Sequence, residues 1–117
     1  MAIQFRKDCT YSILVATSMG VRLTPHSCKP VNSSDNNLIH ETIAETNVAT
    51  VSYKHGHRVK LLTTFVAGSP IARFIKDNLA SRHIDYEGKE VEQGGPWGYR
   101  HQINIADSGY GSRGPRV

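Results

Sequence analysis

The stretch that decides the fold is GGPWGYRHQINIADSGYGSRGPRV, residues 94–117, which contains six of the ten glycines and the only tryptophan. Taken alone, it suits a flexible basic tail that binds nucleic acid, because glycine, arginine and tyrosine supply chain freedom, positive charge and stacking faces. It also suits a folded β-ribbon, because apolar and polar residues alternate within it. The choice between a tail and a ribbon decides how the rest of the chain is interpreted.

The alternation is clearest between Trp97 and Ile105. Successive side chains point to opposite faces of a strand, so this pattern predicts a strand with one buried face. The segment 108–115 is rich in glycine and predicts a loop that leads into a second strand at 116–117. The expected apolar face holds Tyr99, Ile103 and Ile105, and the expected polar face holds Arg100, Gln102 and Asn104.

The bulk composition predicts a folded protein of one domain, or part of one. A chain of 117 residues can bury roughly 65% of its unfolded surface. Its 38% hydrophobic and 21% charged residues lie away from the composition of disordered proteins. The net charge of +4 suits an anionic partner, but the basic residues are spread along the chain, so we do not expect nucleic acid binding.

Cysteine usage and hydropathy predict a cytoplasmic location. Cys9 and Cys28 have no second pair, which gives neither a disulfide framework nor a zinc knuckle, and we expect reduced thiols. The early apolar run 13–16 is too short for a signal peptide or a membrane span. We therefore expect no membrane partner.

The first predicted strands lie before residue 26. Residues 11–17 form a nearly continuous apolar run, which predicts a strand buried on both faces in a parallel sheet. Residues 21–24 alternate and end at Pro25, which predicts a strand with one buried face. The segment 26–37 is rich in proline, serine and asparagine and predicts a loop, with a short strand near Val31.

Helical and strand patterns alternate in the following half of the chain. Residues 59–66 predict a largely buried strand, and 85–93 a single short one. Ser69 can cap a helix that Pro70 opens and that continues to about residue 81. The apolar face of that helix holds Ile71, Phe74, Ile75 and Leu79, whereas an earlier helix over 42–55 places Ala44, Val48, Val51 and His55 at helical spacing.

This order of elements predicts an α/β chain. Two parallel strands joined by a crossover helix stand beside a separate antiparallel element.

Four segments resemble the N-terminal portion of ribokinase or PfkB-type carbohydrate kinases, closest to 2-keto-3-deoxygluconate kinases. They are Arg22-Leu-Thr-Pro25, Ala44-Glu-Thr-Asn-Val-Ala49, Gly68-Ser-Pro-Ile-Ala72 and the stretch 96–117. The resemblance implies a partial ribokinase-like fold, with parallel strands, crossover helices and a β-ribbon lid. It assigns the core to about 10–20 and 42–93, and the lid to about 21–40 and 94–117. It also favours the ribbon over the tail.

The chain departs from the family at two places. Thr42-Ile43 stands where the family has two glycines, and β-branched residues prevent the close backbone approach that glycines allow. The Gly-Ala-Gly-Asp segment that supplies the family's anion hole and catalytic base does not occur. The resemblance implies ATP and Mg²⁺ in the complete enzyme, but we expect this chain alone to bind neither and to be catalytically incompetent, so its status as an enzyme stays open.

Three residues are candidates for binding a small sugar acid. Asn47 matches the family's sugar-contacting asparagine, although an asparagine in a first helical turn is also a common cap. By the resemblance, Arg100 stands at the lid position where related kinases carry a substrate-contacting tyrosine; an arginine there could hold a carboxylate in a bidentate pair, or simply face solvent. Ser18 follows the first strand, where open α/β sheets bind ligands, although turn formation is its commoner role.

Two other functions compete with a sugar-acid kinase. A lid with open strand edges predicts a non-catalytic module that forms a homo-oligomer through the ribbon. A basic tail predicts a nucleic-acid-binding protein, whose affinity would fall steeply with salt. The six histidines lack carboxylate or cysteine partners at ligand spacing, so we expect no metal site.

Overall fold

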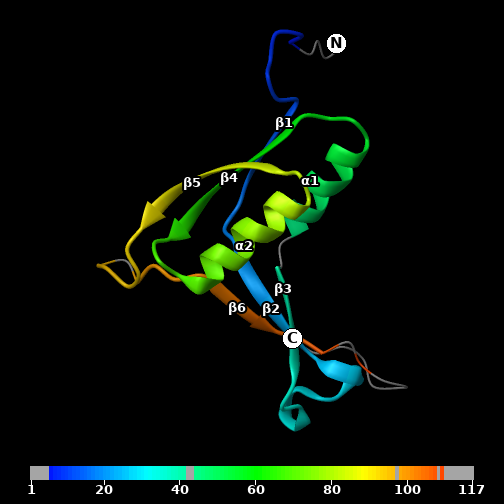
Figure 1. Ribbon diagram of the computed structural model, residues 1–117, viewed down its shortest axis with the longest axis vertical. Helices are drawn as coiled ribbons and strands as arrows, with labels where there is room; N and C mark the ends of the chain where they lie inside the picture. The colour runs from blue at the N-terminus through cyan, green and yellow to red at the C-terminus, as the bar shows by residue number, and fades with distance from the viewer. Residues whose placement is uncertain (1–5, 42–43, 97, 108, 110–117) are drawn as a thin grey trace, which may run out of the picture.

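The computed structural model describes residues 6–41, 44–96, 98–107 and 109. Within these residues the strands form two three-stranded sheets, ordered β1-β4-β5 and β3-β2-β6 (Figure 1). We call the first the core sheet and the second the lid sheet. The predicted strand at 116–117, Trp97, and the Thr42-Ile43 departure lie outside the described residues.

The core sheet is entirely parallel. It contains β1 (Ile13–Ala16), β4 (Val59–Val66) and β5 (Asp85–Val91). Helices α1 (Ala44–Lys54) and α2 (Pro70–Ser81) connect its strands in chain order. The predicted α/β class with parallel strands and crossover helices is confirmed, and β5 adds a third parallel strand of seven residues in the polar segment where one short strand was expected.

The lid sheet projects from one end of the core sheet (Figure 1). Its central strand, β2 (Gly20–Pro25), pairs antiparallel with β3 (Asn37–Glu41) and parallel with β6 (Gln102–Ile105). The sheet is therefore mixed, and the expected purely antiparallel element was wrong. Strand β6 joins it from a distant part of the sequence, and no local pattern specifies the direction of such a pairing.

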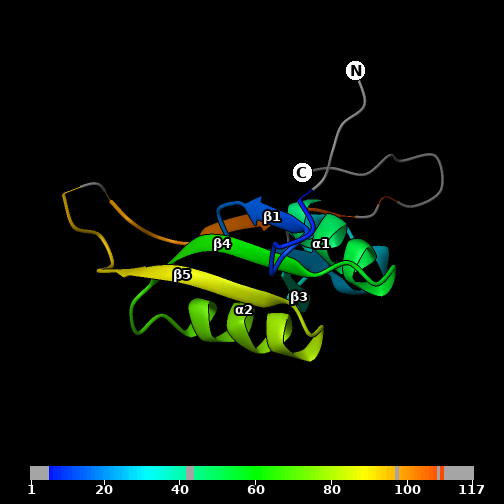
Figure 2. The same cartoon turned by 90° about the horizontal axis from the view of Figure 1, so that it is seen from above.

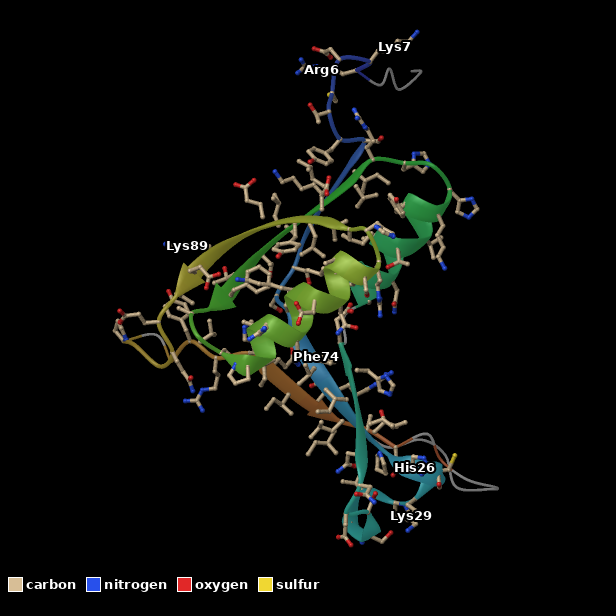
Figure 3. The ribbon with its side chains drawn as sticks, viewed as in Figure 1. Arg6, Lys7, His26, Lys29, Phe74 and Lys89 are labelled. Atoms are coloured by element: carbon tan, nitrogen blue, oxygen red, sulfur yellow. The ribbon has the colours of Figure 1, made fainter. Side chains whose placement is uncertain are left out.

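The connection between β2 and β3 also differs from expectation. It contains two short 3₁₀ turns, His26–Cys28 and Val31–Ser33. The short strand expected near Val31 was therefore wrong, because no neighbouring strand lies there to pair with it. His26 and Lys29 lie at the tip of the lid farthest from the core (Figure 3).

Helix α2 begins and packs as its sequence predicts. Ser69 Oγ accepts a hydrogen bond from the Ala72 amide at 3.4 Å, and Pro70 occupies the first helical position, where its missing amide costs nothing. Ile75 and Leu79 are fully buried. Seen from above, the helix lies under β4 and β5 (Figure 2). Phe74 lies on the part of the helix that approaches the lid sheet (Figure 3).

Helix α1 buries a different face from the one predicted. Thr46 and Ala49 are fully buried, whereas Val48 and Val51 are more than half exposed. The expected apolar face was therefore wrong. Thr46 and Ala49 lie on the side of the helix that packs against β1 and β4. Tertiary packing, and not the spacing of the apolar residues, therefore determines which face of α1 is buried.

One hydrophobic core joins both helices to the same face of the core sheet. Ala49 of α1 and Leu79 of α2 belong to a single cluster with Leu61 and Phe65 of β4. The other face carries Leu14, which is 62% exposed. Exposure therefore alternates along β1, and the expectation that this strand is buried on both faces was wrong, because the described chain covers one face of the sheet.

No helix of the described residues is long and apolar enough to cross a membrane.

Candidate functional site

A pocket of about 280 Å³ opens at the carboxyl ends of all three core strands. Open α/β sheets place their ligand sites at this edge, because the connections that leave the strand ends create a crevice there. The ribbon that precedes β6 forms the opposite wall. The lining residues are Thr17, Ser18, Met19, Thr64, Val66, Val91, Tyr99, Arg100 and His101.

The structure brings two of the three predicted site residues together. Ser18 and Arg100 both line the pocket, and both are exposed. One follows β1 and the other lies on the ribbon, 82 positions later in the chain. Asn47 is not among the lining residues and lies exposed in the first turn of α1.

A sharp turn shapes the ribbon before it reaches the pocket. Gly94 and Tyr99 exchange two backbone hydrogen bonds, of 2.8 and 2.7 Å. Gly94 and Gly98 have φ values of 78° and 64°, in the left-handed region that favours glycine. The turn places Tyr99 and Arg100 directly against the pocket.

His101 is a site residue that sequence reasoning missed. Its ring is buried and contacts two distant backbone groups, with Nε2 3.1 Å from the Val66 amide and Nδ1 3.0 Å from the Met19 carbonyl. Alternation was the available signal, because His101 has the same parity as Tyr99 and Ile103 on the expected buried face. It does not reveal which groups the ring contacts. The partners of the ring lie 35 and 82 residues away, so only the tertiary structure identifies them.

A buried ion pair fixes the lid to the core near the start of α1. Glu41, the last residue of β3, has a side chain only 1% exposed, and its Oε2 lies 3.2 Å from Arg82 Nη2. The geometry is that of an ion pair without a well-aligned hydrogen bond. Arg82 follows α2, so this contact links the lid sheet to the carboxyl end of that helix.

The resolved pKa shifts lie outside the pocket. On the exposed face of the core sheet, the Lys60 ammonium lies 2.7 Å from a Glu87 carboxylate oxygen. This hydrogen-bonded pair lowers the pKa of Glu87 and raises the pKa of Lys60. The pair Arg6 and Asp8 likewise raises the pKa of the arginine and lowers that of the aspartate.

The chemistry of the pocket is that of binding. Arg100 offers a guanidinium, and Ser18 and Thr17 offer hydroxyl groups, while none of the lining residues is an aspartate or glutamate. Among the described residues, no three histidine, cysteine or acidic side chains are grouped to hold a metal ion. The lining set therefore suits an anionic, hydroxylated small molecule and contains no carboxylate base.

Comparison with known proteins identifies the fold through structure. No family model matches the sequence, and neither does any curated protein. A 2-dehydro-3-deoxygluconokinase from Thermotoga maritima aligns over 89% of this chain, with 17% identity, a TM-score of 0.77 and 30% of its own chain covered.

Two further solved structures agree with this match. A PfkB family carbohydrate kinase from Listeria grayi aligns over 89% of this chain, with 24% identity, a TM-score of 0.71 and 31% of its own chain covered. A sugar kinase from Pyrococcus horikoshii, solved in complex with ATP, aligns over 89%, with 16% identity, a TM-score of 0.70 and 33% of its own chain covered.

The chain therefore has the fold of part of a ribokinase or PfkB-type carbohydrate kinase, consistent with the N-terminal portion. The expected partial ribokinase-like fold is confirmed. The chain spans about 30% of the length of these kinases.

Proposed function

We propose that this chain is the N-terminal, sugar-binding part of an ATP-dependent sugar-acid kinase whose substrate resembles 2-keto-3-deoxygluconate. The observation that carries the proposal is the pocket at the carboxyl ends of the core strands, where Arg100 and Ser18 face a common space. The fold is shared with carbohydrate kinases, one of them a 2-dehydro-3-deoxygluconokinase. The proposed ligand is a small, hydroxylated carboxylic acid.

Each predicted residue has a chemical role in this proposal. The planar guanidinium of Arg100 can donate two parallel hydrogen bonds to a carboxylate, which a lysine cannot reproduce. The Ser18 hydroxyl can donate to or accept from a sugar hydroxyl. Asn47 offers both a donor and an acceptor to vicinal hydroxyls, and this role requires the ligand to extend beyond the pocket walls toward α1.

Phosphoryl transfer needs groups that this pocket does not contain. The reaction requires bound phosphates, neutralisation of their charge and a base for the attacking hydroxyl. In the complete kinase, ATP and Mg²⁺ would supply the phosphoryl group and the neutralising charge. The exposed face of the core sheet supports a longer functional protein, because parallel sheets are normally covered on both faces. We therefore expect no turnover from these 117 residues alone.

Calorimetric titration of the chain with 2-keto-3-deoxygluconate tests the proposed ligand, with glucitol as a matched uncharged polyol. We expect the acid to bind and Arg100→Met to weaken it about 10- to 100-fold, the value of a charge-assisted hydrogen-bonded pair. Arg73→Met removes an exposed arginine from α2, outside this pocket, and should leave binding unchanged. Equal binding of acid and polyol, or steady ADP production by the chain, would contradict the proposal.

A second candidate function is self-association through the lid sheet. Val21 and Leu23 of β2 pair with Ile103 and Ile105 of β6, and Leu23 also pairs with Ile39 of β3, so these side chains share one face. Ile39, Ile103 and Ile105 are 55%, 54% and 46% exposed. An exposed apolar sheet face of this kind favours burial against a second copy in a two-fold arrangement.

A further inference from the structure

We propose that His101 is a positioning residue that joins the lid ribbon to the end of β4 and to the connection between β1 and β2 at the pocket, and that it does so as the neutral Nδ1–H tautomer. This histidine has no role in the sugar-binding proposal. Its effect on ligand affinity rests on that proposal, but the tautomer and the contact with β4 do not.

The first contact completes the hydrogen bonding of β4 where β1 has ended. The Thr17 amide donates to the Leu62 carbonyl at 3.0 Å, so Leu62 directs its backbone polar groups toward β1. The backbone polar groups of every second residue in a strand point toward the same neighbouring strand. Val66 is four residues after Leu62, so its amide also points toward the β1 side. Because the pairing of β1 with β4 ends at Ala16 and Leu62, no β1 residue is paired with Val66. His101 Nε2 accepts the Val66 amide hydrogen at 3.1 Å instead.

The second contact fixes the tautomer. The Met19 carbonyl can only accept a hydrogen bond, so the hydrogen must lie on His101 Nδ1, 3.0 Å away. The Val66 amide can only donate, so Nε2 must keep its lone pair. The residue is 8% exposed, which leaves little access for water to replace either partner. The two contacts together require a neutral imidazole with one defined tautomer.

The ring therefore positions both predicted ligand-binding residues of the pocket. Met19 directly follows Ser18, and Arg100 directly precedes His101. Bonds from one ring to the Met19 carbonyl and to the end of β4 thus fix the backbone next to Ser18 and next to Arg100. Loss of the ring would leave the ribbon free to shift away from the strand ends.

A second proton on the ring would oppose this arrangement. A protonated Nε2 would be a donor facing the Val66 amide, which is also a donor, so this hydrogen bond would be lost. Among the residues lining the pocket, Arg100 and Tyr99 are the other charged or titratable ones, and both lie on the ribbon. From α2 and β5, the ion pair of Lys76 and Glu90 lies beside Phe65, whose ring centroid is 6.3 Å from that of His101. The connection between β1 and β2 contributes uncharged residues to this wall, Thr17, Ser18 and Met19.

Nuclear magnetic resonance of the ¹⁵N-labelled full chain tests the tautomer directly. At neutral pH, the long-range ¹H–¹⁵N spectrum of the ring should show a protonated Nδ1 and an unprotonated Nε2. On acidification, the protection of the Val66 amide, taken relative to the intrinsic exchange rate at the same pH, should fall, while the protection of Leu61, in the middle of β4, should stay unchanged. A protonated Nε2 in the neutral ring, or a mixture of tautomers, would overturn the proposal.

Two substitutions separate positioning from simple space filling. His101→Phe keeps a ring but removes both nitrogens, and we expect Val66 amide exchange about five- to tenfold faster than in the wild type. His101→Gln keeps an acceptor near the Nε2 position and should recover most of the protection. His57→Phe, at an exposed site before β4, is the matched control. Unchanged exchange in His101→Phe would overturn the proposal.

If the phenylalanine variant does not fold, the wild-type tautomer and its acid titration still decide the question. A sugar acid that fails to bind would contradict the proposed function and leave these measurements unaffected.

Discussion

Single residues hold the lid in place by contacting partners from distant segments of the chain. Glu41 ends β3 with a carboxylate that is buried, and its counter-ion, Arg82, comes from the end of α2. A buried charge without a partner is costly, because the protein interior solvates it poorly. The contact therefore fixes β3 relative to α2 more firmly than an exposed ion pair would.

Arg82→Ala should reveal the cost of leaving the Glu41 carboxylate unpaired. The arginine side chain is 33% exposed, so water screens part of the interaction. We expect the free energy of unfolding, measured by chemical denaturation, to fall by about 2 kcal/mol. Arg73→Ala, an exposed position on the preceding helix, should change it by less than about 0.5 kcal/mol. Equal effects of the two substitutions would show that the ion pair contributes nothing.

At the scale of the elements, β4 is the centre of the molecule. It pairs with β1 and β5, packs against α1 and ends at the pocket. Phe65, near its end, is fully buried, and its ring lies against the backbone of β5 at Gly88. A Cβ atom at that glycine would stand 2.3 Å from the ring, far inside van der Waals contact.

Gly88→Ala should therefore disturb the packing between β4 and β5. The added methyl group must displace the Phe65 ring from the core, and overpacking of this kind costs about 1–3 kcal/mol of unfolding free energy. Thermal denaturation followed by circular dichroism measures the loss. Gly68→Ala offers a contrasting control, since nothing lies within 4 Å of its added Cβ, but its φ of 70° imposes a backbone cost of about 1 kcal/mol. Wild-type stability of Gly88→Ala would contradict the steric argument.

At the scale of the whole molecule, two surfaces lack a covering layer within the described chain. One is the face of the core sheet that carries Leu14, and the other is the part of the apolar face of the lid sheet that holds Ile39, Ile103 and Ile105. The kinases that this chain matches are about three times as long, and the remaining part of such a fold can cover the first surface. The second favours the proposed self-association.

Sedimentation velocity over a range of concentrations tests self-association through the lid. We expect dimers, and we expect Ile103→Lys to raise the dissociation constant at least tenfold, because it places a charge at the centre of the proposed apolar contact. Asn104→Lys adds the same charge on the opposite face of β6 and should leave association unchanged. A monomer at all concentrations, or equal effects of the two lysines, would contradict association through this face.

Local patterns were sufficient wherever an element depends on neighbouring residues. Ser69 and Pro70 specify the start of α2, and the apolar spacing that ends at Leu79 specifies its buried face. Alternation in the closing stretch correctly predicted a strand at β6, but the expected burial of its apolar face was wrong, because Ile103 and Ile105 are 54% and 46% exposed. The position at the end of the first strand led to Ser18, and the resemblance to the family's lid led to Arg100; the fold brings both to one pocket.

Capping, turn formation and periodicity act within a few residues, so the sequence alone specified both helices and most of the strands in their order, but not β3 (Asn37–Glu41), which follows a segment expected to be a loop. Only the tertiary structure decided that α1 buries Thr46 in place of Val48, that β6 runs parallel to β2, and that His101 joins Met19 to Val66. Each of these depends on groups far apart in the chain. Their partners become neighbours only when the closing stretch folds against the strand ends as a ribbon.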